Sequence, residues 1–132
     1  MRIYISSVLV DDVSRAHDFY TEKLGFQVKD DVENDGFRWL TVTNAGIDPS
    51  EASMELLLEP KGHPAAAPFT EGLKASGIPL TQFLSDDVEA ETAELKEKGV
   101  EFTTDPMDIG PAKIAVFDDT VGNLIQLIQL KK

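Results

Sequence analysis

Glu55 is the residue of this 132-residue chain whose type and surroundings point most directly to chemistry. It stands in the apolar run 54–58, where strand alternation turns it to the opposite face from its two immediate neighbours. A carboxylate facing inward there is costly unless it is paired or hydrogen-bonded. One interpretation is a satisfied polar contact, with Gln126 donating to Glu55 and Ser7 or Gln82 nearby. The other is functional: Glu55 binds a cationic or hydrogen-bond-donating ligand, or acts without metal as a general base whose pKa is raised by desolvation.

The remaining side chains capable of chemistry carry weaker signals. His17 falls on an expected helix several positions past its cap, and we interpret it as a solvated or packed helix histidine. His63 lies in a connector and could reach the rim of a pocket, although no spacing motif joins the two histidines. Trp39 could line a pocket or pack beneath a helix, and alternation alone leaves both open. Lys113 is interpreted as an exposed strand lysine.

An internal repeat sets the architecture of the chain. Residues 9–13 read Leu-Val-Asp-Asp-Val and return at 84–88 as Leu-Ser-Asp-Asp-Val. Glu22-Lys23 returns as Glu97-Lys98 at the same offset. Self-similarity of this kind predicts that two copies of one supersecondary unit make the protein.

Each copy is predicted to contain a strand, a helix and three more strands. In module one, 1–59, Asp11 or Asp12 caps the helix, Gly25 ends it, and Asp35-Gly36 forms a hairpin. The expected strands are 3–10, 26–32, 37–43 and 53–59.

Module two is predicted to span 80–132, after a connector at 60–79 that holds a short helix at 68–76. Asp86 or Asp87 caps its helix, with Asp86 and Glu89 resembling a capping box, and Gly99 stops it. Gly122-Asn123 suits a turn of positive φ. The expected strands are 80–85, 101–105, 112–118 and 124–130, with a loop at 106–111.

Two sequence patterns resemble the vicinal oxygen chelate superfamily, the glyoxalase I, bleomycin-resistance and extradiol dioxygenase group. The first half carries Val-Asp-Asp-Val at 10–13, Phe-Tyr at 19–20 and Leu-Gly-Phe at 24–26. The chain closes with Asp-Asp-Thr-Val-Gly-Asn-Leu-Ile-Gln-Leu at 118–127. The resemblance implies one α+β domain over 1–132. Its two tandem βαβββ modules would form a cup-shaped, half-barrel mixed sheet with helices on the convex side, often completed in a homodimer.

The resemblance also implies where a metal would bind. Its ligand positions correspond to Ile5, Glu55, Leu80 and Gln126, with Glu55 and Gln126 taken as the same place on the two closing strands. A divalent ion acting as a Lewis acid needs about three or four oxygen or imidazole ligands. Isoleucine and leucine cannot ligate, and one carboxylate with one amide would not retain an ion. We therefore predict no metal and no other cofactor, a divalent metal being the alternative.

Composition limits the kinds of partner that the chain is expected to bind. Net charge is −12, from 24 acidic and 12 basic residues, which argues against nucleic acid and anionic membranes. No apolar run approaches the ~20 residues that span a bilayer. No secretory signal is visible, and the chain has no cysteine, which suits a cytoplasmic location.

Two functions follow from these observations. The first is a metal-free protein of the bleomycin-resistance type that binds or sequesters a small molecule, through Ser7, Trp39, Glu55, Gln82 and Gln126. The second is an enzyme, a lyase, isomerase or dioxygenase-type oxidoreductase, with a displaced site in which Glu55 is catalytic. Whether the chain is an enzyme is left open.

Overall fold

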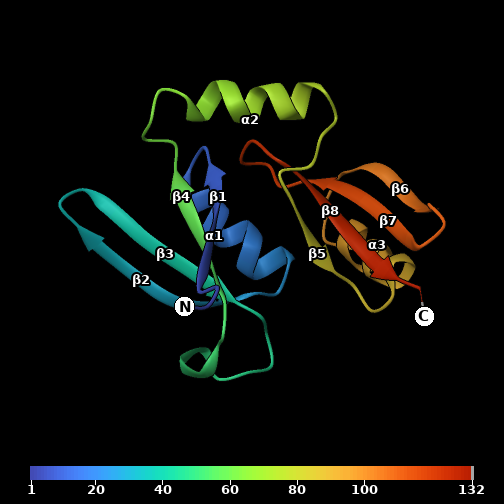
Figure 1. The fold of residues 1–132 in the computed structure, drawn as a ribbon, viewed down its shortest axis with the longest axis horizontal. Helices are drawn as coiled ribbons and strands as arrows, with labels where there is room; N and C mark the ends of the chain where they lie inside the picture. Colours follow the sequence, from blue (N-terminus) through green and yellow to red (C-terminus); the bar gives the residue numbers. More distant parts are fainter. Residues whose placement is uncertain (132) are drawn as a thin grey trace. The chain divides into compact units, whose positions relative to one another are not determined.

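The computed structural model describes residues 1–131, which divide into two compact units, Met1–Ala66 and a second that begins at Ala67. The first unit holds one four-stranded mixed sheet in the order β1-β4-β3-β2, with β1 parallel to β4 (Figure 1). Its elements are β1 Ile5–Val10, α1 Val13–Asp18, the π-helical turn η1 Phe19–Lys23, β2 Gln27–Asn34, β3 Phe37–Thr43, the 3₁₀ turn η2 Pro49–Glu51 and β4 Glu55–Pro60.

The second unit repeats this topology in a sheet ordered β5-β8-β7-β6, with β5 parallel to β8. The fold is therefore α+β, with two open four-stranded sheets. The remaining elements are α2 Ala66–Ala75, β5 Thr81–Leu84, α3 Val88–Glu97, β6 Phe102–Asp108, β7 Ala112–Asp118 and β8 Leu124–Leu130.

The helix caps confirm the repeat residue by residue. Asp12 accepts from the Arg15 N–H at 3.0 Å, and Asp87 accepts from the Ala90 N–H at 3.1 Å. Both caps have an extended backbone with φ −148°. Asp87 is thus the N-cap of α3, and the capping box expected at Asp86 is wrong.

Three local expectations need correction. β6 continues through Pro106 to Asp108 where a loop was expected, and its pairing with β7 is irregular between Thr104 and Met107, which accommodates a residue without an N–H. The first helix winds into a π turn, because the Leu24 N–H donates to the Phe19 carbonyl five residues back. In the turn before β8, positive φ falls on Thr120 and Gly122, and not on the predicted Asn123.

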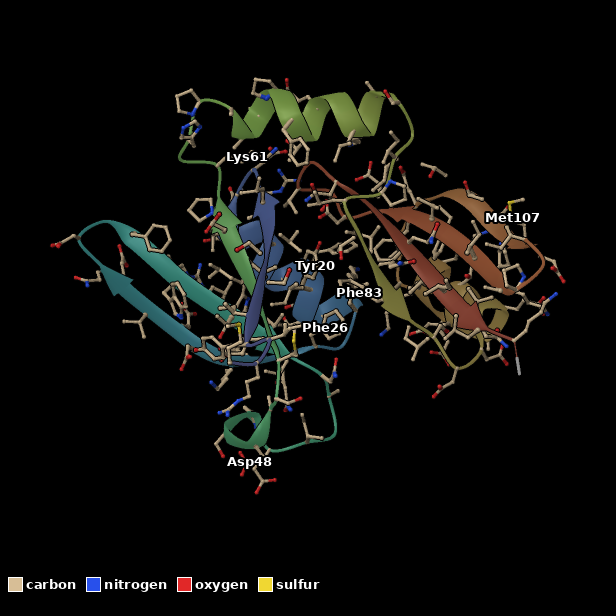
Figure 2. All side chains as sticks on the ribbon, viewed as in Figure 1. Tyr20, Phe26, Asp48, Lys61, Phe83 and Met107 are labelled. Atoms are coloured by element: carbon tan, nitrogen blue, oxygen red, sulfur yellow. The ribbon has the colours of Figure 1, made fainter. Side chains whose placement is uncertain are left out.

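Each sheet buries one face against its own helix. In the first unit α1 packs on β3 and β4, and Tyr20, labelled in Figure 2, is fully buried beside it. The apolar residues with at most 1% exposure there are Val8, Val10, Ala16, Tyr20, Leu40, Val42 and Leu58.

The opposite face of the first sheet, here called the inner face, is defined by strand register. Ile5 pairs with Glu55, Ser7 with Leu57, and Thr41 with Leu57 across the other edge of β4. Paired residues share a face, and alternation adds Trp39. The inner face therefore comprises Ile5, Ser7, Trp39, Thr41, Glu55 and Leu57.

Asp87→Ala should lower the free energy of unfolding by about 1 kcal/mol, because it removes the acceptor for the Ala90 N–H at the start of α3. Urea unfolding followed by circular dichroism measures the change. Asp86→Ala is the matched control, an exposed neighbour expected to change stability by less than about 0.5 kcal/mol. Equal losses in the two variants would contradict the assignment of Asp87 as the N-cap of α3.

Candidate functional site around Glu55

Glu55 opens β4 with its side chain almost fully buried, at 1% exposure. Its N–H donates to the Tyr4 carbonyl at 3.0 Å, which fixes the backbone just before β1. The partner directly across the parallel pair is Ile5. A carboxylate is thus held among strand residues with an aliphatic side chain opposite, an arrangement that requires charge compensation from elsewhere.

Lys29 supplies that compensation. Its Nζ lies 2.8 Å from Glu55 Oε2, and the lysine side chain is 23% exposed. The donor to Glu55 Oε2 thus comes from β2 of the same unit. The amide of Gln126 donates to Gln82.

A β-bulge explains why Lys29 reaches the inner face. Val28 pairs with Val42, which is packed on the helix side, whereas Asp30 pairs with Thr41 on the inner face. Lys29 is the extra residue between these two pairs. A bulge inserts one residue and changes which face the following side chains take. The Lys29 ammonium therefore reaches the Glu55 carboxylate on β4, two strands away.

Two hydroxyl groups complete the surroundings of the carboxylate. The Thr41 hydroxyl accepts from the Asp30 N–H at 3.2 Å, and Thr41 and Tyr4 both also interact with Glu55. Glu55 Oε1 is buried and has no hydrogen bond of standard geometry from any of residues 1–131.

The balance of these contacts lowers the pKa of Glu55. Burial raises this pKa, but hydrogen bonds from Lys29, Thr41 and Tyr4 outweigh burial and bring it below the ordinary value. The same pairing raises the pKa of Lys29, and the Glu55 carboxylate raises the pKa of the Tyr4 hydroxyl. The raised pKa proposed for Glu55 as a general base is therefore wrong, and the carboxylate is a weaker base than an isolated glutamate.

The residues around Glu55 do not fit a divalent ion. The position opposite Glu55 is aliphatic, and the carboxylate is already bound to an ammonium group. Within residues 1–131 no three His, Cys, Asp or Glu side chains gather in a metal-binding group. His63 Nδ1 accepts from the Ala65 N–H at 3.0 Å, and His17 Nδ1 lies 3.0 Å from Asp18. Both histidines thus have local partners.

The second unit carries an amide pair in place of an ion pair. Gln126 Nε2 donates to Gln82 Oε1 at 2.8 Å, and the two residues are direct partners across β5 and β8. The register places Val116 opposite Gln126 as it places Thr41 opposite Leu57. Gln126 is therefore the counterpart of Leu57.

The counterpart of Glu55 in the second unit is Leu124, whose carbonyl accepts from the Leu80 N–H at 2.9 Å. Equating Glu55 with Gln126 is thus off by two residues. The face predicted for Gln126 is nevertheless right, because a shift of two residues preserves alternation.

The other predicted contact residues also have definite places. Ser7 is exposed on β1. Trp39 lies on the inner face, partly exposed and paired with Val32, so it does not pack beneath the helix. Phe37, two residues earlier on β3, shares this face and is 41% exposed. Sequence reasoning missed Lys29, Tyr4 and Thr41, whose only signal was their position on neighbouring strands.

None of the helices formed by residues 1–131 is long and apolar enough to cross a membrane.

Two open mixed sheets, each formed by a βαβββ unit, define the class of this protein as a vicinal oxygen chelate fold. Residues 4–127 match the family profile described as Glyoxalase/Bleomycin resistance protein/Dioxygenase superfamily, and the chain belongs to that family.

Three similar proteins cover nearly the whole chain. The uncharacterized protein YurT of Bacillus subtilis (strain 168) is 48% identical over 130 residues, covering 98% of this chain and 99% of that protein. The crystal structure of UcmS2 has a TM-score of 0.81 at 30% identity, with 97% of each chain covered. The structure of TnmS3, an antibiotic binding protein from Streptomyces sp. CB03234, has a TM-score of 0.77 at 30% identity, covering 99% of this chain and 97% of that one.

The lowered pKa of Glu55 makes stability depend on pH in a defined direction. A carboxyl group with a folded pKa below its unfolded value of about 4.5 contributes stability above that value and loses it as pH falls through the folded pKa. Glu55→Gln should therefore flatten the fall in unfolding free energy below about pH 4.5, by at most about 1.4 kcal/mol per pH unit. Urea unfolding from pH 3 to 8 tests this. Exposed Glu51→Gln, the control, should keep the wild-type profile.

Proposed function

We propose that this protein binds a small organic molecule and does so without a divalent metal. The observation that carries the proposal is the Lys29 ammonium, 2.8 Å from Glu55 Oε2, with aliphatic Ile5 opposite. The carboxylate that could have held a metal is committed to an internal partner. The likeness to an antibiotic binding protein at 30% identity supports a binding role.

The guest is expected to lie against Trp39 and Ser7 on the inner face of the first sheet. Trp39 is partly exposed there, beside exposed Val32 and Phe37, so the far end of the β2–β3 hairpin offers apolar and aromatic contact area. Because Lys29 already compensates Glu55, the site gives a cationic guest no uncompensated charge at that carboxylate. A flat, largely apolar organic molecule with hydrogen-bonding groups fits this surface best.

Gln82 and Gln126 are proposed as polar contacts on the corresponding face of the second sheet. The Gln126 Nε2 donates to the Gln82 Oε1. The Gln126 oxygen and the Gln82 nitrogen therefore remain for hydrogen bonds to a guest. A homodimer in the cytoplasm is also expected, and light scattering of the purified protein tests the oligomeric state.

Metal content is the first measurement that tests the proposal. Protein purified without chelator and then offered Ni, Mn, Fe, Zn and Mg should hold far less than one equivalent of any of them by elemental analysis, because the donor set around Glu55 does not fit a divalent ion. Stoichiometric metal, or an activity abolished by chelator, would contradict the proposal. It would favour the alternative of a metal-dependent lyase, isomerase or dioxygenase that uses Glu55.

Trp39 provides a direct readout of ligand binding because it is the only tryptophan of the chain. Compounds that raise the Tm in a thermal-shift screen of flat aromatic molecules should also quench or shift Trp39 fluorescence. Trp39→Ala should weaken their binding at least about tenfold by calorimetry. Phe69→Ala, at a 53% exposed position on α2, is the control and should leave affinity unchanged. Equal affinities in the two variants would remove Trp39 from the site.

A further inference from the structure

We propose that the second unit holds a separate binding site for an organic amine, at the carboxyl ends of β5 and β8. The ammonium group of the ligand pairs with Asp86, and its carbon skeleton lies against Leu84 and Leu130. All residues of this site belong to the second unit, so the inference goes beyond the proposed role of Trp39 and does not depend on it.

A cavity of about 820 Å³ is the first observation that supports this site. It lies where the parallel strands β5 and β8 end side by side (Figure 1). Leu84 and Leu130 provide apolar contact area there, with 68% and 61% of their surface exposed. Pockets of roughly 300–1,000 Å³ hold drug-sized organic molecules, so the cavity is large enough for such a ligand. The lining residues are Leu84, Ser85, Asp86, Gln129, Leu130 and Lys131.

The first unit shows which charged group this end of the repeated fold can hold. There Lys61 forms an ion pair with Asp11, and the lysine side chain is only 10% exposed. Asp86 is the counterpart of Asp11 in the repeat. The match between the closing strands β4 and β8, continued to their ends, makes Leu130 the counterpart of Lys61. The second unit therefore keeps the carboxylate but lacks the ammonium group, which the ligand supplies.

The charges of the cavity lining favour a cation. Asp86 is exposed and forms no ion pair within the part of the chain that the structure describes, residues 1–131. Lys131, the positively charged residue of the lining, is paired with Asp108. Asp86 therefore keeps an uncompensated negative charge beside the cavity. The net charge of −12 adds a field that attracts cationic ligands to the protein.

The Ser85 hydroxyl is a second polar group that points to a ligand. Ser85 is 4% exposed, and its Oγ is buried without a hydrogen-bond partner among the described residues 1–131. Its counterpart in the repeat is Val10, which is fully buried and apolar. A buried hydroxyl without a partner is unfavourable in a folded protein. An ammonium group donates up to three hydrogen bonds, so it can bind the Asp86 carboxylate and the Ser85 oxygen together.

Two matched probes, 4-phenylbutylamine and its neutral analogue 4-phenyl-1-butanol, test the recognition of charge in an NMR titration of the whole chain. The amine should shift the backbone amide signals of residues 84–86 and 129–131, and it should bind at least about tenfold more tightly than the alcohol. Asp86→Asn should remove this preference. Glu51→Gln, at an exposed acidic residue of the first unit, is the control and should keep it. Equal affinities for amine and alcohol in the wild type, or no shifts at these residues, would overturn the inference.

Leu130→Lys is the second variant, because it introduces into the second unit the ammonium group that the first unit has at the same position. The introduced lysine should pair with Asp86 and weaken binding of 4-phenylbutylamine at least about tenfold. Leu130→Met is the matched control and should bind the amine like the wild type. Wild-type affinity in Leu130→Lys would contradict the inference. Binding at Trp39 is read separately from its indole N–H signal, so failure of the amine site is distinguishable from failure of the proposed function.

Discussion

The inner face of the first sheet depends on one constraint, the compensation of a buried carboxylate. Glu55 is surrounded by strand residues and faces Ile5 across the parallel pair, so its charge must be balanced from a neighbouring strand. Lys29 does this from within the same unit, because it is the inserted residue of a bulge in β2 and lies toward the inner face. The ion pair lowers the basicity of Glu55 and occupies its Oε2 atom.

Much of the architecture could be predicted from sequence because its signals are local. Asp12 and Asp87 cap their helices through contacts three residues away, and Asp35-Gly36 closes a hairpin with both residues at positive φ. Alternation placed Glu55 and Gln126 on the correct faces, because successive side chains of a regular strand point to opposite faces of the sheet. Each of these features is determined by residues a few positions apart, where sequence spacing and spatial neighbourhood coincide.

The partners of the polar residues could not be predicted, because they depend on register between strands. Nothing in the residue types around Lys29 marks it as the inserted residue of a bulge, yet one insertion decides which face the lysine takes. The same limit explains the misplaced counterpart of Glu55: the repeated sequence predicts the helix caps, but the match between the closing strands β4 and β8 depends on how each pairs with its neighbours, and that match is two residues away from the predicted one. Lys29 and Tyr4 were therefore missed even though the carboxylate they serve was found.

The two units share one topology but pair the polar side chains of their sheets differently. The first balances a carboxylate with an ammonium, and the second pairs two amides, Gln82 with Gln126. Both arrangements pair polar side chains within one unit. Partly exposed Trp39 and its apolar neighbours offer contact area at low conformational cost. This contact area is the physical support for the proposal that the protein holds a small organic guest.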